Sequence, residues 1–312
     1  MLTVIGRRSL WAIPVLFVIQ TSVFLLLNAL GDPAVAQLGP RASAAQLQNW
    51  RHQHGTDRPL GTRYLEYMGG LVHGDMGVSH QESRRSVTDV LETRLPRTAL
   101  LGAMAIVIEV VLGLLLGVIA AVRRNTLVDT GVMGVAILGI SAPTFVTGLL
   151  FLNILAFRFG WFPVGGYGVD AMDHLRHALL PAFTLAITGI ATYARVMRAE
   201  MLETLRSDYI RTARAKGLSE FRTVVVHAVR NALLPVVTLV GLSLPIIVSG
   251  AIISEAIYAW PGLGRLAVES ITSRDDPVVM GVVLLSSLGV VIGNLFADIG
   301  VAALDPRVRT DG

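Results

Sequence analysis

Six long apolar runs dominate this chain of 312 residues and constrain its fold more than any other feature. A helix that crosses a bilayer needs about 20 largely apolar residues, and in lipid it must satisfy its own backbone hydrogen bonds. Only Glu109 and Asp298 place a charge inside the runs. Charged residues make up 15% of the chain, against about 25% in soluble domains. We therefore predict an all-α membrane protein. Its six transmembrane helices are expected at residues 9–30, 98–122, 130–157, 178–194, 231–254 and 277–303.

The basic residues in the connections indicate the orientation. The termini and connections 123–129 and 195–230 together hold 14 basic residues, whereas connections 158–177 and 255–276 hold four. Segment 31–97 holds eight more, but loops longer than about 60 residues cross the membrane largely regardless of charge. Because short cytoplasmic connections are enriched in Lys and Arg, we predict that both termini and segment 195–230 face the cytoplasm.

The N-terminal run allows a second interpretation, a cleaved signal peptide. Arg7 and Arg8 precede the run, and the small residues 34–36 are similar to a cleavage site. The run covers about 22 residues, whereas the apolar part of a signal peptide usually covers about 7–15. We therefore favour a retained first helix.

The runs divide the chain into four parts. Residues 1–30 hold the first helix, and residues 31–97 form a polar segment outside the cytoplasm. Residues 98–303 form the transmembrane domain, which includes the cytoplasmic connection, and residues 304–312 form a cytoplasmic tail. The sequence shows no internal repeat, so a single helix bundle is expected.

Small and helix-ending residues indicate local structure. In the polar segment, Ser43 is a predicted N-cap and Gly55 the end of the same helix. Gly113 and Gly117 are spaced for close helix contact, in which small residues simply fill a helix interface. Prolines in or near the apolar runs predict kinks, because proline lacks an amide donor. They are Pro143, Pro181, Pro235 and Pro245.

The sequence lacks the motifs of several function classes. It contains no G-x-x-x-x-G-K-[ST] nucleotide loop, no H-E-x-x-H zinc motif and no G-x-S-x-G nucleophile motif. The chain has no cysteine, which excludes disulfides and zinc–thiolate sites. His52 and His54 lie two apart in the polar segment, where solvated surface histidines are favoured over a metal site.

Glu109 is a candidate functional residue because it lies near the middle of a predicted span. An ionisable group at that depth costs several kcal/mol unless it is paired or wet. We favour a protonated or hydrogen-bonded carboxyl that holds two helices together. A proton relay would need several such groups, and Glu109 stands nearly alone.

The cytoplasmic connection contains the most informative local pattern, "DYIRTARAKGLSE". Acidic residues are interleaved with the basic ones, which argues against a nucleic-acid partner. Read as a helix, the stretch has Asp208 at its start and Arg214 and Lys216 at its end, which suits the helix dipole. Gly217 fits the left-handed position after a helix, and Ser219 can cap the next one.

This short helix would have two faces. Tyr209, Ile210 and Ala213 lie on one face, and Arg211 and Arg214 lie on another. Such an element can press an apolar ridge and a charged rim into a groove of a partner protein. The alternative is a basic loop that only fixes the topology, and spacing alone does not choose between them.

Several motifs carry a resemblance to a known family. "DYIRTARAKGL" (208–218) followed by "HAVRNALLP" (227–235) resembles the cytoplasmic signature of ABC importer permeases, and more narrowly the B-type permease of dipeptide and oligopeptide importers. Other stretches resemble that family in order along nearly the whole chain. They are "LGDP" (30–33), "GWFPVGGYG" (160–168), "HALLPAFTLA" (177–186), "EAIYAWPGLGRL" (255–266), "RDDPVV" (274–279) and "LDPRVR" (304–309).

The chain departs from the general importer pattern at one place. That pattern reads Glu-Ala-Ala, three residues and then Gly, and Arg211, Thr212 and Ala213 stand at the first three positions before Gly217. Only the second Ala and the Gly are retained. The form "RTARAKG" resembles the usual form of the peptide branch. The departure therefore narrows the resemblance from importer permeases in general to that branch.

The resemblance implies a type I permease fold and a set of partners. These are a second homologous permease subunit, two cytoplasmic ATPases and an extracytoplasmic substrate-binding protein, in the inner membrane. ATP and Mg would bind to the ATPases, so no cofactor and no catalytic residue is expected on this chain. The implied ATPase-coupling element is Asp208, Tyr209, Ile210, Arg211, Thr212, Ala213, Arg214, Ala215, Lys216, Gly217 and Leu218.

By resemblance, the chain forms half of the pathway for peptides delivered by the binding protein. The same branch includes permeases for nickel, glutathione and oligosaccharides, and a stand-alone secondary transporter or a membrane receptor are further alternatives. Two external loops, 158–177 and 255–276, carry aromatic residues that could contact the binding protein or simply form compact turns. These candidate contacts are Trp161, Phe162, Tyr167, Tyr258 and Trp260.

Overall fold

The computed structural model describes residues 2–81, 85–249 and 252–304, and within them the chain is helical apart from connections and one isolated bridge between Val78 and Ser86. The long helices are α1 (Leu2–Ala29), α5 (Val87–Val122), α8 (Ala171–Thr204), α11 (Val229–Ser249) and α14 (Asp276–Leu304). By length and composition four helices can each cross a membrane, and two bent helix pairs raise the number to six. The prediction of an all-α membrane protein is confirmed.

The helices extend further than the apolar runs. The run at 98–122 belongs to α5, which begins at Val87 and has 36 residues. The run at 178–194 belongs to α8, which has 34 residues and continues into the polar sequence on both sides. Hydrophobicity therefore locates the part of a helix that can lie in lipid, whereas the helix ends lie in polar sequence.

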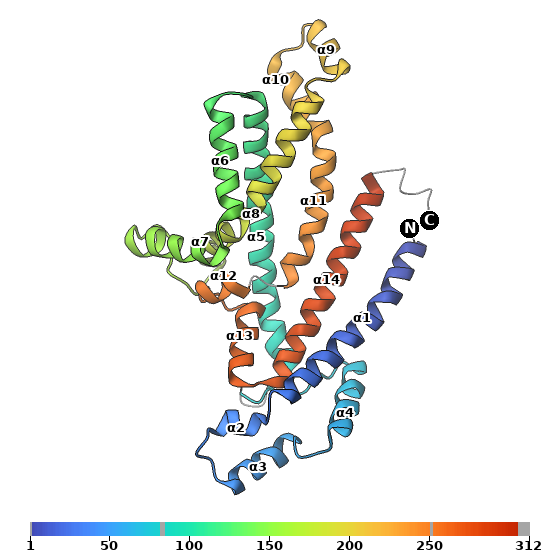
Figure 1. Ribbon diagram of the computed structural model, residues 1–312, viewed down its shortest axis with the longest axis vertical. Coiled ribbons are helices and arrows are strands. Elements are labelled where there is room, and N and C mark those ends of the chain that lie inside the picture. The colour runs from blue at the N-terminus through green and yellow to red at the C-terminus, as the bar shows by residue number, and fades with distance from the viewer. Residues whose placement is uncertain (1, 82–84, 250–251, 305–312) are drawn as a thin grey trace.

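The predicted helix at 130–157 is bent, as the kink predicted at Pro143 indicates. The structure breaks it into α6 (Leu127–Ser141), α7 (Thr144–Phe151) and a π-helical segment (Leu152–Arg158), with a bend of 107°. Ala142 is extended, with ψ of 125°, and precedes Pro143. A residue before proline is driven out of the helical region by the proline ring. Figure 1 shows α7 projecting sideways from the bundle.

Helices α5 and α8 approach closely along their length. A Cβ atom added at Gly117 would lie 2.7 Å from the carbonyl oxygen of Ala194 and 2.7 Å from the Cβ of Met197, so no larger residue fits without a shift. Gly113 meets the Cβ of Tyr193 in the same way, at 2.5 Å. The predicted close contact at this glycine pair is confirmed.

Short elements occupy the two ends of the bundle. At one end lie α9 (Asp208–Ala215), α10 (Glu220–Arg222) and a π-helical segment (Thr223–Ala228) that leads into α11. Toward the other end lie α13 (Leu263–Ser273) and the polar segment, with α12 (Ile252–Ile257) nearer the middle of the molecule in Figure 1. The predicted span 231–254 is thus divided between α11 and α12, and its residues 250–251 lie outside the described part of the chain.

The polar segment contains α2 (Pro33–Leu38), α3 (Ala44–His54) and α4 (Leu60–Val72). The predicted caps of α3 are confirmed, because Ser43 forms a capping box with Gln46 and Gly55 is left-handed. Figure 1 shows these helices at the opposite end of the molecule from α9 and α10.

Arg274 fixes the polar segment to the bundle. Its guanidinium donates to the carbonyl oxygens of Leu27, Leu30 and Gly31 at the end of α1, at 2.9, 3.1 and 3.0 Å. These carbonyls have no partner inside the helix, which is the usual state of a helix C-terminus. Arg274 also pairs with Asp276 at 3.1 Å, so one side chain connects α1 to the start of α14.

We expect Arg274→Ala to loosen this junction. Three carbonyl oxygens would lose their charged donor, and a hydrogen bond to a charged group contributes about 1.5–3 kcal/mol at most, less here because Leu30 and Gly31 are exposed. The measurement is limited proteolysis of the purified protein in detergent, with cleavage in residues 31–81 followed over time. Arg41→Ala is the matched control, because Arg41 is exposed. Equal cleavage rates in the two variants would contradict the assigned role.

Candidate functional site

Helix α9 and the turn that follows it form at the residues that the sequence indicated. Asp208 lies in the first turn and Arg214 in the last. The chain then passes through Gly217, whose φ of 82° is left-handed, with its amide bonded to the carbonyl of Arg214 at 2.9 Å. Ser219 caps the next helix by accepting from the amide of Arg222. The predicted helix, glycine turn and serine cap are all confirmed.

The apolar face of α9 packs against its own chain. Ile210 is fully buried in a cluster with Met201 of α8 and Val224 of the following segment, and Ala213 is buried as well. The Tyr209 hydroxyl accepts a hydrogen bond from Asn231 at 2.8 Å, although its ring is partly exposed. In this conformation Ile210 and Ala213 are therefore not available to the groove of a partner.

The other face of α9 is exposed and charged. Arg214 and Glu220 form a two-point ion pair, with nitrogen–oxygen distances of 2.7 and 3.1 Å. Lys216 makes no ion pair within the part of the chain that the structure describes. The exposed members of the predicted element are Asp208, Tyr209, Arg211, Thr212, Arg214, Ala215, Lys216 and Gly217, with Leu218 half-buried. Figure 1 shows α9 beyond the ends of the long helices.

The predicted aromatic contacts divide into exposed and buried residues. Trp161 is exposed, whereas Phe162 and Tyr167 are half-buried. Tyr258 and Trp260 are buried, at 1% and 0% exposure. The prediction that these two residues contact a binding protein is therefore wrong for this conformation.

The buried pair holds the two loops together. The Tyr258 hydroxyl lies 3.0 Å from the carbonyl of Gly148, and the Trp260 indole donates to the carbonyl of Arg97 at 3.1 Å. The Tyr167 ring packs edge-on against Trp260, with ring centres 5.0 Å apart. These aromatic residues thus join two loops that are about 90 residues apart in the chain. The sequence alone did not indicate this contact.

Glu255 is a buried residue that the sequence analysis missed. Its carboxylate accepts from the Thr98 hydroxyl at 2.8 Å and from the Arg265 amide at 3.0 Å. Burial raises the pKa of the Glu255 carboxyl, and these two hydrogen bonds act in the opposite direction. The sequence does contain one indication of this residue, because Glu255 is an acidic residue directly after the apolar run 231–254.

We expect Glu255→Gln to destabilise the protein. A glutamine would turn an amide N–H toward groups that donate, and an unmet buried donor costs about 1–3 kcal/mol. The thermal midpoint of the purified protein is the measurement. Glu269→Gln is the control, because Glu269 forms an exposed ion pair with Arg265, a type worth about 0–1 kcal/mol. An unchanged midpoint in Glu255→Gln would contradict this network.

Glu109 lies on α5 and faces a cavity of about 280 Å³ between α5, α8 and α11. Ser243 of α11 lines the same cavity and lies beside this carboxyl. The carboxyl thus lies between helices, and its role stays a prediction.

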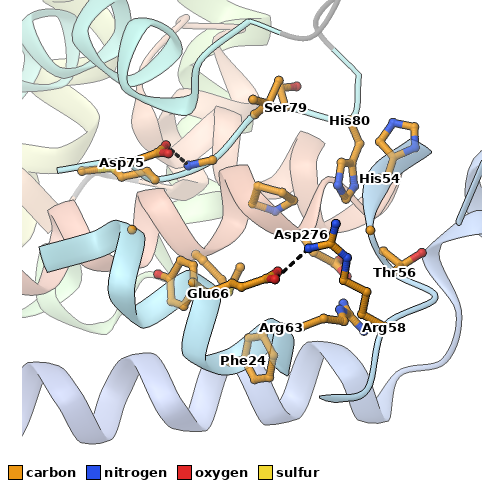
Figure 2. A pocket seen from close by; sticks show the side chains of 18 of the residues that line it. Phe24, His54, Thr56, Arg58, Arg63, Glu66, Asp75, Ser79, His80 and Asp276 are labelled. Atoms are coloured by element: carbon orange, nitrogen blue, oxygen red, sulfur yellow. Dashed lines mark hydrogen bonds and ion pairs between the residues drawn. The ribbon is translucent and has the colours of Figure 1, made fainter. Parts of the chain in front are cut away.

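A larger pocket of about 530 Å³ lies between the polar segment and the start of α14. Figure 2 shows Arg58, Glu66, His80 and Asp276 around it. Arg58 and Glu66 pair at 2.7 Å. Burial lowers the pKa of His80, and the neighbouring Asp275 carboxylate acts in the opposite direction.

The histidines of this region do not gather into a metal site. His52 is exposed and pairs with Asp57 at 3.0 Å, and His54 stacks on Trp50 with ring centres 4.0 Å apart. No group of three or more His, Cys, Asp or Glu with metal-binding geometry occurs among residues 2–81, 85–249 and 252–304.

Two family models cover the chain. Residues 113–310 match the binding-protein-dependent transport system inner membrane component, and residues 1–102 match the N-terminal part of such membrane components. The chain belongs to this family of inner membrane transport components. It is thus a multi-pass membrane protein and a permease subunit of an ABC importer.

Curated relatives span the whole chain. The oligopeptide transport system permease protein AppB of Bacillus subtilis is 38% identical over 309 residues, which are 97% of this chain and 98% of that protein. The glutathione transport system permease protein GsiC of Escherichia coli is 40% identical over 310 residues, 99% of each chain. The permease is thus similar to relatives that are named for two different cargoes, oligopeptides and glutathione.

A solved structure agrees at the level of the fold. The crystal structure of an amino acid ABC transporter with histidines has a TM-score of 0.50 to the permease, with 18% identity. The match covers 70% of this chain and 94% of that one. The type I permease fold is therefore confirmed.

Proposed function

We propose that the permease forms half of the membrane pathway for peptides, and that α9 with its glycine turn receives the movement of a cytoplasmic ATPase. The observation that carries this proposal is the arrangement of α9. Its charged face is exposed, whereas Ile210 is buried between α8 and the start of α11. A force on the exposed face is therefore passed directly to two long helices.

The packing beneath α9 supports a rigid connection. Met197 and Met201 of α8, Ala228, and Ala232 and Val236 of α11 form one buried cluster with Ile210. Closely packed side chains transmit displacement because protein interiors have few voids and low compressibility. Movement of α9 would thus move α8 and α11 together.

The partners and the orientation follow from the same proposal. The α9 end faces the cytoplasm, where two ATPases hold ATP and Mg, and both termini lie on that side. The polar segment and the loops of α7, α12 and α13 face an extracytoplasmic binding protein. A second, homologous permease subunit completes the pathway.

Peptides are the proposed substrate class because of the relatives. AppB is named for oligopeptides and GsiC for glutathione, and both are covered over nearly their whole length. An oligopeptide and glutathione share amide bonds, an amino group and carboxylates. Neither nickel nor an oligosaccharide carries this combination of groups. A peptide is therefore the favoured cargo.

Reconstitution tests the function directly. We expect peptide uptake into proteoliposomes only when the permease is combined with its second permease, the ATPases, ATP and the binding protein. Uptake by the permease alone would instead indicate a stand-alone secondary transporter. ATP-dependent uptake of another cargo, with none of any peptide, would overturn the substrate class and leave the importer assignment.

Gly217→Val tests the coupling element. A β-branched residue tolerates positive φ poorly, and the left-handed conformation costs about 1–2 kcal/mol for a non-glycine residue. No atom lies within 4 Å of a Cβ added at Gly217, so the effect would come from the backbone rather than from a clash. We expect ATP-driven uptake to fall sharply.

Gly217→Asn is the matched control, because Asn adopts the left-handed region more readily than other residues. It should retain most uptake. The measurements are uptake and co-purification of the ATPases for both variants. Normal uptake in Gly217→Val would remove this turn from the coupling element.

A further inference from the structure

The Glu109 carboxyl is isolated inside the helix bundle. Glu109 of α5 is 9% exposed, and Ser243 of α11 lies beside its carboxyl. No cationic side chain that the structure describes lies close enough to interact with it. A carboxylate inside a membrane costs several kcal/mol unless it is paired or wet. The cavity beside it is therefore suited to a positively charged group.

The cavity is built to hold the carboxyl in place. A Cβ atom at Gly189 of α8 would overlap the Oε2 atom of Glu109, so only glycine leaves room for this side chain. The Tyr193 hydroxyl lies 3.0 Å from the Ser243 hydroxyl, which fixes the neighbour of the carboxyl in turn. These residues come from α8 and α11, and together with Glu109 of α5 they line the cavity.

Other polar atoms around the cavity are hydroxyls. Thr188, Thr192, Tyr193 and Ser243 line it together with Glu109, and the remaining lining is apolar apart from Thr98. One carboxylate with several hydroxyls is a poor set for a divalent metal, which usually takes carboxylates, carbonyls and water in a fixed number. A primary ammonium instead has three donors and one charge, and these ligands match it.

The size of the cavity limits what enters it. Its volume of about 280 Å³ lies below or at the lower end of pockets for drug-sized ligands, which measure about 300–1,000 Å³. The cavity therefore accommodates one end of a peptide and not a whole oligopeptide. Thr188 is exposed at its edge, so the cavity opens to the surface of the bundle on that side.

We infer that this cavity binds the amino-terminal ammonium of the peptide during passage, with Glu109 as the pairing group. The inference rests on the proposed function, since it takes the cargo to be a peptide. It gives the permease its own recognition of cargo, separate from that of the binding protein.

The test combines a substitution in the protein with the removal of the amino group from the peptide. Uptake of trialanine and of its desamino analogue is measured in proteoliposomes that contain the complete transporter, with both peptides saturating the binding protein. Glu109→Gln keeps the size and a polar end group but removes the charge. A lost charge-assisted hydrogen bond predicts that trialanine uptake falls about tenfold or more, whereas uptake of the analogue changes by less than about twofold.

Several results would overturn the inference. Unchanged trialanine uptake in Glu109→Gln would do so, and so would an equal loss for both peptides, which indicates a carboxyl that only holds helices together. ATPase activity stimulated by the binding protein should remain in the variant. If Glu109→Gln does not assemble, Glu109→Asp takes its place, and a loss confined to trialanine is again expected.

The controls separate this inference from the proposed function. Arg123→Gln, which removes an exposed charge at the C-cap of α5, should leave uptake of both peptides unchanged. If the unaltered transporter takes up no peptide at all, the proposed function fails and this inference fails with it. If it takes up both peptides and Glu109→Gln affects them equally, only the ammonium site fails.

Discussion

The close approach of α5 and α8 is the constraint on which the rest of the structure depends. In lipid, helices gain little from burying apolar side chains against one another, so association relies on tight packing and polar contacts. Gly113 and Gly117 of α5 allow backbone contact with α8 that no larger residue permits. The same pair of helices supplies Glu109 and Gly189, so the spacing that stabilises the bundle also shapes its internal cavity.

Helix α8 connects the cavity to the element that meets the ATPase in our proposal. It contains Gly189 beside the Glu109 carboxyl, then Arg198, which holds Asp129 of α6 through nitrogen–oxygen distances of 2.6 and 2.7 Å. One turn further, Met201 packs against Ile210 of α9. A displacement of α9 therefore reaches the cavity through one uninterrupted helix, without a separate relay of side chains.

Sequence alone predicted those features that depend on neighbouring residues. The membrane helices, the left-handed Gly217 and the cap at Ser219 follow from hydrophobicity and local backbone preference, and the structure has all of them. The burial of Tyr258 and Trp260 and the hydrogen bonds of Glu255 depend on contacts between segments far apart in the chain. The bend at Pro143 was predicted as a kink, but its angle of 107° was not.

Three buried acids show why Glu109 stands apart. Asp129 is neutralised by the Arg198 guanidinium, and Glu255 accepts from a hydroxyl and a backbone amide. Both therefore have partners that meet the cost of burial, and both join elements of the fold. Glu109 has a hydroxyl beside it, no described cation and an adjoining cavity. A carboxyl that serves only the fold needs no such space, whereas a carboxyl that meets a passing ammonium does.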